Sequence, residues 1–440
     1  MILLRAFSLL CLCAASLAHG AEVTVPPGAG TLAAAIAGAT PGDVLILGAG
    51  TYGPAVIDRR LTIDGQGLAV VDGGGQGTVL TITGDDVTLR GLHVQGSGQR
   101  NETIDAGIKV MKGAKRALIE DNVLTGNMHG IDFHGSIDGA ARRNDITGSR
   151  DPLMVARGNG FYVWNAPGTV IEDNRVRYGR DGIFANASRK DSFRRNLFRD
   201  LRFAVHYMYT NDSDVTGNIS VGNHLGFAVM FSRNVTVQGN LSLSDRDHGV
   251  MLNGTNSSDV VGNLVMGAHK CTFIYDANKN LIANNLYQGC DIGIHFTAGS
   301  ERNAITGNAF IANRNQVKYV GTRDVEWSLE GTGNYWSDLP AFDLNGDGRA
   351  DQAFRPNDLM DHILWSQPAA SLLIGSPAVQ LIRWSQSSFP ATLPGGVLDS
   401  HPLMAPIPIP IPEDIAAMQA MVGDRWLKDT EDDPDSALSE

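Results

Sequence analysis

Apolar and polar residues alternate in short runs that recur about every 22 residues through most of the chain. Nine of these runs, which begin at residues 107, 130, 160, 182, 204, 226, 249, 271 and 293, mostly open with glycine and carry apolar residues at their second and fourth positions. Alternation with a period of two is typical of a strand with one buried face. The repeat shows no helical period, so it predicts short strands whose second and fourth side chains point into a core.

An asparagine follows each run by fourteen or fifteen residues, and successive asparagines are separated by 22, 30, 22, 22, 22, 23, 22 and 23 residues. They are Asn122, Asn144, Asn174, Asn196, Asn218, Asn240, Asn263, Asn285 and Asn308. Further apolar columns flank this ladder, for example Phe193 before Asn196 and Ile219 after Asn218. Three strands per repeat predict an all-β right-handed parallel β-helix. We expect the asparagines to stack at one bend, in left-handed backbone geometry, with amides bonded to the coils above and below.

The pattern divides the chain into four parts. Residues 1–20 read as a secretory signal with cleavage near Gly20–Ala21, because Arg5 precedes a short apolar run. Residues 21–335 form the predicted β-helix, with a helical cap at 31–37, and 336–405 form a C-terminal cap or docking region that is partly helical. Residues 406–440 read as a proline-rich spacer followed by an acidic tail.

Composition narrows the choice of partners. The 440 residues carry a formal charge of −12, which argues against nucleic acid as the main partner. No second segment holds eighteen consecutive apolar residues, so any membrane association is expected to run through a partner.

The third and fifth positions of the repeated strands should face solvent, yet they are rich in methionine, histidine and aromatic residues. Exposed apolar surface marks a binding site, and here the candidate docking residues are Tyr162, Trp164, Phe184, Phe273 and Tyr275. Thioether and imidazole groups also favour copper, especially Cu(I), and the candidate ligands are His206, Met208, Met230, His248 and Met251. Any one of these residues alone would more often be a packing residue, and the docking and copper interpretations are compatible with each other.

A β-helix that cleaves or epimerises polysaccharides needs acids and bases on this face. Asp132 is the only carboxylate at the outward positions, so we expect a protein that is not an enzyme. A polysaccharide-binding or -modifying protein of the lyase or epimerase kind remains the alternative, since Tyr162, Trp164 and Phe184 are able to stack on sugar rings. The one long step of the ladder holds an insertion, 149–157, which we expect to overhang this face.

The C-terminal region offers three further candidate features. Oxygen ligands with calcium-loop spacing occur at Asp343, Asn345, Asp347 and Asp351, although Phe354 replaces the usual final Glu, and an Asx-rich turn is the alternative. Helices are predicted at 357–365 and 376–384, where Leu381 and Trp384 either cap the rod or dock a partner. Cys271 and Cys290 fall on neighbouring coils and form either a disulfide or a pair of thiols.

Several C-terminal motifs, together with the repeats, resemble the NosD family, the periplasmic proteins required to mature nitrous oxide reductase. The motifs lie at 333–338, 343–351, 355–365, 375–380 and 395–404. The resemblance implies a periplasmic accessory protein that works with an ABC-type ATPase and permease. It implies support for assembly of the copper–sulfur centre of the reductase, with apo nitrous oxide reductase and a copper chaperone as further partners. Copper would be transient and calcium structural.

Overall fold

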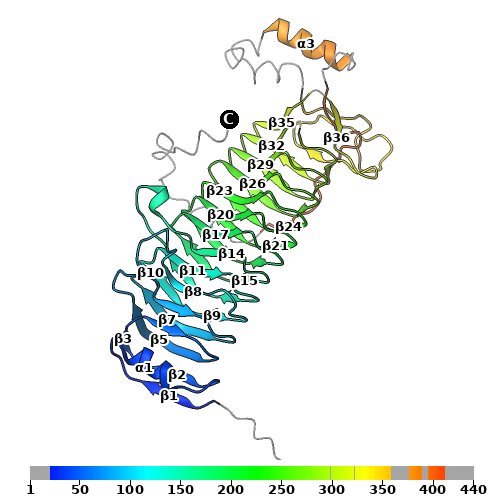
Figure 1. Cartoon of the computed structure of the whole chain (residues 1–440). Coiled ribbons are helices and arrows are strands. Elements are labelled where there is room, and N and C mark those ends of the chain that lie inside the picture. The colour runs from blue at the N-terminus through cyan, green and yellow to red at the C-terminus, as the bar shows by residue number, and fades with distance from the viewer. Residues whose placement is uncertain (1–19, 298, 322, 358–375, 389–394, 412–440) are drawn as a thin grey trace, which may run out of the picture.

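The computed structural model describes residues 20–297, 299–321, 323–357, 376–388 and 395–411. These residues form a rod-shaped parallel β-helix of about 14 turns, as the sequence predicts (Figure 1). Each regular coil contributes three short strands, for example β17 (Asp181–Asn186), β18 (Ser192–Arg194) and β19 (Leu197–Arg199). Every strand pair that follows the rod is parallel, so each strand lies on the equivalent strand of the preceding coil.

One long face of the rod is a sheet of twelve strands. Its members are β4 (Ala55–Ile57), β6 (Leu80–Ile82), β8 (Ala106–Val110), β11 (His129–His134), β14 (Phe161–Trp164), β17, β20 (Phe203–Met208), β23 (Leu225–Met230), β26 (His248–Asn253), β29 (Lys270–Tyr275), β32 (Ile292–Thr297) and β35 (Asn315–Val320).

The other two faces belong to a sheet of 24 strands, whose two arms share the long strands β5 (Thr62–Asp72) and β7 (Thr88–Gln95). The first arm also contains β1 (Glu22–Val25), β2 (Val44–Leu47), β9 (Leu118–Glu120), β12 (Ala140–Arg142), β15 (Val170–Glu172), β18, β21 (Ser213–Thr216), β24 (Val235–Gln238), β27 (Asp259–Val261), β30 (Leu281–Ala283) and β33 (Ala304–Thr306). The second arm contains β3 (Gly50–Tyr52), β10 (Val123–Thr125), β13 (Asp145–Thr147), β16 (Arg175–Arg177), β19, β22 (Ile219–Val221), β25 (Leu241–Leu243), β28 (Leu264–Met266), β31 (Leu286–Gln288), β34 (Ala309–Ile311) and β37 (Tyr335–Trp336).

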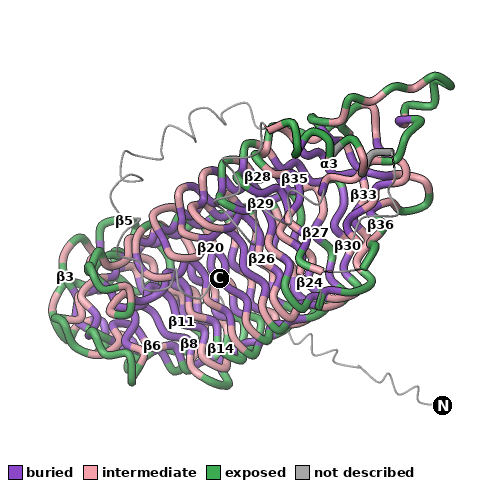
Figure 2. Tube along the Cα trace, turned by 90° about the horizontal axis from the view of Figure 1, so that it is seen from above, coloured by how far each residue is buried: buried purple, intermediate pink, exposed green. Residues whose placement is uncertain are grey.

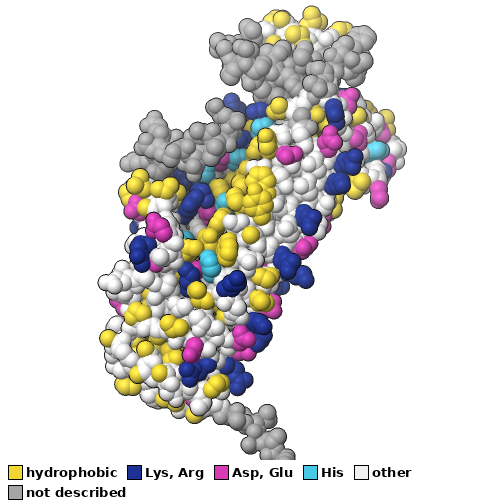
Figure 3. All heavy atoms as spheres, in the orientation of Figure 1, with side chains coloured by type: hydrophobic (Ala, Val, Ile, Leu, Met, Phe, Trp, Pro, Cys, Tyr) yellow, Lys and Arg dark blue, Asp and Glu magenta, His cyan; other side chains and the backbone are white. Residues whose placement is uncertain are grey.

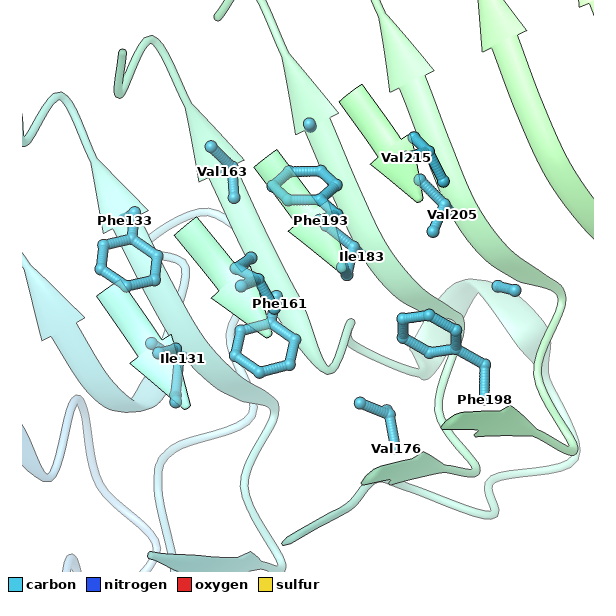
Figure 4. Close-up of a cluster of buried hydrophobic side chains, with 14 of the residues drawn as sticks. Ile131, Phe133, Phe161, Val163, Val176, Ile183, Phe193, Phe198, Val205 and Val215 are labelled. Atoms are coloured by element: carbon cyan, nitrogen blue, oxygen red, sulfur yellow. The ribbon is translucent and has the colours of Figure 1, made fainter. Parts of the chain in front are cut away.

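The inward positions of the three faces meet in one continuous hydrophobic core. Figure 4 shows Phe161 and Val163 from β14 lying near Val176 and Phe193 from the other faces of the rod. All four side chains are almost completely buried, and Figure 2 shows burial concentrated along the strands and exposure along the bends. Stacking of like residues over many coils therefore keeps apolar surface away from water along the whole rod.

The N-terminal end is closed by a short helix, α1 (Thr31–Gly38), which contacts β1 and β4. Leu32 and Ile36 are its buried residues and point onto the first coil. The sequence placed this helix correctly. Closure matters because an open β-helix end would expose unpaired backbone and core side chains.

The asparagine ladder is present, but its backbone geometry corrects the sequence interpretation. In Asn218, the backbone N–H and Nδ2 both donate to Asn240 Oδ1, at 2.9 and 3.1 Å, and Nδ2 also donates to Phe193 O at 2.8 Å. The expectation of left-handed asparagines is wrong, because the positive φ belongs to the residue before each asparagine, such as Arg195 at 52° and Gly217 at 63°. That preceding residue makes the turn and leaves the asparagine side chain aimed along the rod.

The ladder ends on a buried carboxylate that the sequence did not reveal. Asn308 donates to Asn334 Oδ1, and the backbone N–H of Asn334 donates to Asp399 Oδ2 at 2.7 Å. The same oxygen accepts from Trp336 Nε1 at 2.8 Å. Strand β38 (Gly396–Leu398) brings Asp399 here by pairing in parallel with β36 (Asp324–Glu326). Residues 395–403 thus belong to the last coil of the rod.

Other C-terminal predictions have mixed outcomes. Helix α3 (Pro377–Ser388) is present, and Ser376 Oγ accepts from the backbone N–H of Val379 as an N-cap does. The helix predicted at 357–365 and the predicted signal peptide lie almost wholly outside the described residues. The acidic tail beyond Ile411 lies entirely outside them. Within the described residues, no helix has the length and hydrophobicity needed to cross a membrane.

Cys271 and Cys290 are joined in a disulfide, with Cα atoms 5.8 Å apart.

Candidate metal-binding and docking surface

The candidate site lies on the outward side of the twelve-stranded sheet, which we call the His/Met face. Strand register stacks its residues in two columns. The first column contains Asp132, Tyr162, Phe184, His206, Ala228, Met251, Phe273 and His295, and the second contains His134, Trp164, Asn186, Met208, Met230, Asn253 and Tyr275. Figure 3 shows hydrophobic side chains gathered along the rod with histidines beside them.

His206 is held by a buried ion-pair network. Its Nδ1 lies 3.2 Å from Asp181 Oδ2, and Arg202 Nη2 lies 2.7 Å from the same oxygen. Burial opposes ionisation of Asp181, but the Arg202 charge and the hydrogen bonds from His206 and Arg202 hold the pKa of this carboxyl below its ordinary value. His206 Nε2 is buried and has no hydrogen-bond partner among the described residues. A histidine oriented by a carboxylate through one nitrogen, with the other nitrogen unused, is the arrangement found at metal ligands.

His248 repeats this arrangement farther along the rod. Its Nδ1 lies 2.7 Å from Asp247 Oδ2, a close ion-pair contact whose angle is not that of a hydrogen bond. Burial lowers the pKa of His248 despite the opposing effect of Asp247, so the imidazole favours its neutral, ligating form. Its Nε2 is also buried without a partner in the described part of the chain.

The methionines lie on the same two strands as these histidines and on the strand between them. Register places Met208 directly beside Met230, and His206 lies on the same strand as Met208. Met251 lies one coil beyond Ala228, which itself neighbours His206. The five sequence candidates therefore occupy three adjacent coils, with Met208, Met230 and His206 at neighbouring positions and His248 and Met251 on the next coil.

Carboxylates border this face at the bends as well as at Asp132. Asp132 was identified from its outward position, but Asp181 and Asp247 lie at the bends where the strands begin, three or four residues before an outward side chain. Asp132 is still the only carboxylate in the two outward columns, but counting those columns alone misses the carboxylates at the bends. Asp132 itself is fully buried, with Lys109 Nζ at 3.2 Å and His134 Nδ1 at 3.6 Å, and burial lowers the pKa of nearby His129 to about 4.

The predicted docking residues fall into two groups of ring contacts, Tyr162, Trp164 and Phe184 on earlier coils and Phe273 with Tyr275 farther along the rod. Tyr162 and Phe184 have centroids 5.5 Å apart, and Phe184 and His206 have centroids 5.0 Å apart. Trp164 and Tyr275 are the most open of the set, at 36% and 51% exposure. The insertion loop carries the short helix η1 (Met154–Ala156) with Val155 70% exposed.

Helix α3 presents the other two docking candidates. Leu381 and Trp384 are each 63% exposed. Side chains that cap the end of a hydrophobic core would be buried, so the capping interpretation does not fit these two residues.

The calcium-like loop is closed by its own backbone. The Asp343 carboxylate accepts from the amides of Gly346 and Gly348, Asn345 Oδ1 accepts from Asp347 N, and Asp351 Oδ2 accepts from Leu344 N. These are the bonds of an Asx-rich turn. Among the described residues no group of three or more His, Cys, Asp or Glu could hold a metal ion, so calcium at this loop stays a prediction without structural support.

The fold and the His/Met face define a parallel β-helix protein with histidine, methionine and aromatic side chains along the outer side of one sheet. A family model described as "Periplasmic copper-binding protein (NosD)" matches residues 142–341. The chain is 40% identical over 373 residues to the probable ABC transporter binding protein NosD of Pseudomonas aeruginosa, which covers 81% of this chain and 87% of the relative. It is 37% identical over 374 residues to the protein of the same name from Stutzerimonas stutzeri, covering 81% and 86%. The chain belongs to the NosD family, a periplasmic copper-binding family.

Solved structures with a similar architecture come from other families. An alginate lyase, AlyF-OU02 in complex with G6, has a TM-score of 0.55 at 14% identity and covers 72% of this chain and 87% of its own. The Streptococcus pneumoniae surface protein and adhesin PfbA has a TM-score of 0.54 at 11% identity, covering 66% and 94%. At these identities the likeness concerns the fold alone.

Proposed function

We propose that this protein is a periplasmic accessory protein that supports assembly of the copper–sulfur centre of nitrous oxide reductase. It acts with an ABC-type ATPase and permease and is a binding scaffold, not an enzyme. The His/Met face receives copper from a copper chaperone, apo nitrous oxide reductase, or both. Membership of a periplasmic copper-binding family and relatives named as ABC transporter binding proteins support this proposal.

The observation that carries the copper role is the pair of buried, unpartnered imidazole nitrogens. His206 Nε2 and His248 Nε2 each belong to a ring whose other nitrogen faces a carboxylate. A buried polar atom without a partner is costly, and ligation of a metal would relieve that cost. The thioethers of Met208, Met230 and Met251 are soft ligands suited to Cu(I). The donor set therefore fits copper carried as cargo.

Docking would use two separate surfaces. The aromatic residues Tyr162, Trp164, Phe184, Phe273 and Tyr275 lie on the same face as the donor set, so a reductase or chaperone bound there would approach the copper ligands. Helix α3, with exposed Leu381 and Trp384, lies beyond the last coils and would contact the permease. This separation would let one partner remain bound while another exchanges.

The test replaces His206, Met208, Met230 and Met251 together with alanine. The expected protein keeps its circular dichroism spectrum, loses Cu(I) binding in an anaerobic titration, and yields copper-poor reductase in cells. A matched control replaces exposed Val56 and Leu68 with alanine, which leaves copper loading unchanged. Full copper loading of the reductase by the folded quadruple variant would overturn the proposed role.

A further inference from the structure

Two carboxylate–histidine pairs lie next to each other at the bend that leads into the His/Met face. Asp247 directly precedes β26, His248 opens that strand, and His269 lies at the same bend one coil later, directly before β29. The backbone N–H of Lys270 donates to Asp247 O at 2.7 Å, and that of His269 donates to Arg246 O at 3.3 Å. These bonds stack His269 on Asp247, so His269 and His248 start one coil and one residue apart.

The two histidines differ in exposure. His248 is 2% exposed, and its Nε2 is buried without a hydrogen-bond partner among the described residues. The side chain of His269 is 48% exposed. Among the histidines that the structure describes, only His93 is also exposed, and it lies on β7 in the 24-stranded sheet. His269 is therefore the most accessible described histidine at the His/Met face.

Asp291 orients the exposed imidazole. His269 Nδ1 lies 2.9 Å from Asp291 Oδ2, and an ionised carboxylate only accepts hydrogen bonds, so Nδ1 carries the proton. The lone pair of neutral His269 is then on Nε2, as in histidines that bind metals. His248 faces Asp247 in the same sense, with Nδ1 2.7 Å from Oδ2. Each ring thus keeps Nε2 for a ligand, one on an exposed side chain and one on a buried side chain.

We infer that His269 is the entry ligand for copper, which takes Cu(I) from a docked carrier on Nε2 and passes it to His248 Nε2 on the preceding coil. This inference rests on the copper role proposed above. A carrier cannot contact the buried nitrogen directly, so an exposed ligand beside it lets the metal be shared during transfer. One coil and one residue separate the two Cα atoms by roughly 6 Å, within reach of two imidazole side chains. Copper stays Cu(I), because one ligand replaces another and no electron or proton moves.

Charge at this bend also bears on a cation that enters here. Asp247 and Asp291 each place a carboxylate next to one of the two imidazoles, and a carboxylate beside a neutral ligand attracts Cu(I). Lys270 opposes this effect. Its Nζ lies 3.9 Å from Asp247 Oδ1 and 5.1 Å from the centroid of the Phe273 ring, so its charge is directed at those two groups.

The test measures how fast the full mature chain takes Cu(I) from a chromophoric Cu(I) chelator in anaerobic stopped-flow. His269→Ala should slow loading by about 10-fold or more and change Kd by no more than about two-fold, because the final ligands are untouched. Since Kd is the ratio of the release and loading rate constants, release to excess chelator should slow by the same factor. His93→Ala, at the exposed histidine of another sheet, is the matched control and should load at the unmodified rate.

Two further variants separate a ligand from a structural ion pair. His269→Met supplies a thioether that binds Cu(I) but does not pair with Asp291, and it should load nearly as fast as the unmodified chain. His269→Lys keeps a charge pair with Asp291, but its protonated amine has no lone pair, so it should load as slowly as His269→Ala.

Two results would overturn the entry role. One is an equal loading rate for His269→Ala and the unmodified chain. The other is His269→Met loading no faster than His269→Lys, because the ion pair and not the ligand would then control the rate. A separate outcome, no uptake of Cu(I) by the unmodified chain, would remove the copper role itself and the entry role with it.

Discussion

Asp181 and His206 lie on adjacent coils with Oδ2 and Nδ1 3.2 Å apart. Arg202 holds the same carboxylate through two nitrogens, at 2.7 and 2.8 Å, so the acceptor is fixed in place. With a proton on Nδ1, the lone pair of His206 is on Nε2, the atom that has no partner in the described chain. The coil spacing of the fold thereby sets both the position of the imidazole and the nitrogen that is left without a partner among the described residues.

Replacing Asp181 by asparagine should weaken Cu(I) binding by about 10- to 100-fold, because loss of an orienting carboxylate commonly costs that much. The measurement is an anaerobic competition titration against a chromophoric Cu(I) chelator, with circular dichroism to confirm the fold. Asp151→Asn, in the exposed insertion loop, is the control and should bind as the unmodified chain does. Equal affinity for Asp181→Asn and the control would mean that Asp181 does not orient a copper ligand.

Removing one rung of the asparagine ladder should destabilise the rod. The Asn240 side chain accepts from Asn218 through Oδ1, and its Nδ2 donates to Val215 O and Asn263 Oδ1. Asn240→Ala leaves these buried groups without partners, which should cost about 2–4 kcal/mol. Urea unfolding measures the loss, and Gln238→Ala, an exposed change on the same coil, should stay within about 0.5 kcal/mol. A loss no larger than that of Gln238→Ala would contradict the structural role of the ladder.

Much of the fold is predictable because every coil repeats the same alternation of inward and outward side chains. The inward columns follow from period-two alternation, and Phe161, Ile183, Val205 and Phe227 all lie where that alternation places them. The turn geometry was missed although the residue before most of the ladder asparagines is Gly, Asp or Asn, the types that most readily adopt positive φ. Arg195 adopts positive φ at 52° even though it is neither Gly nor Asn.

The candidate surface was predictable only where side chains alternate regularly. Met208 and Met230 were placed side by side by counting from the ladder, and the register agrees. Asp181 and Asp247 were not predicted as part of this surface. The chain bends at the start of each strand, and there the alternation of side chains no longer tells which way a side chain points. The contact of Asp399 with Asn334 was not predicted because 65 residues separate the two in the sequence.

Asp245 should make the rod less stable as pH rises. Burial raises the pKa of this carboxyl to about 7, although Ser242 Oγ and the backbone N–H of Asn223 donate to it. The folded state therefore holds the Asp245 proton more tightly than the unfolded state does. The contribution of protonated Asp245 to the free energy of unfolding is fully present below about pH 4. It is lost as pH rises to about 7, and it amounts to no more than about 4 kcal/mol.

Asp245→Asn removes this titration while keeping an amide oxygen for Asn223. Urea unfolding at pH 4, 6 and 8 should show the variant gaining stability over the unmodified chain as pH rises. Subtracting the two curves cancels the contribution of other groups, including Asp191, whose pKa burial also raises to about 7. A difference that does not change between pH 4 and pH 8 would show that Asp245 titrates normally.

Helix α3 should be dispensable for folding but needed for partner binding. Leu381 and Trp384 are each 63% exposed, so Leu381→Glu with Trp384→Glu should change the free energy of unfolding by no more than about 0.5 kcal/mol. A central aromatic residue often contributes 2 kcal/mol or more to an interface, so affinity for the detergent-solubilised permease should fall by at least about 30-fold in a binding titration. Leu344→Glu, at a position 85% exposed in the Asx-rich loop, is the matched control and should leave the affinity unchanged. Permease affinity equal to that of Leu344→Glu would remove α3 from the docking surface and leave the His/Met face as the remaining candidate.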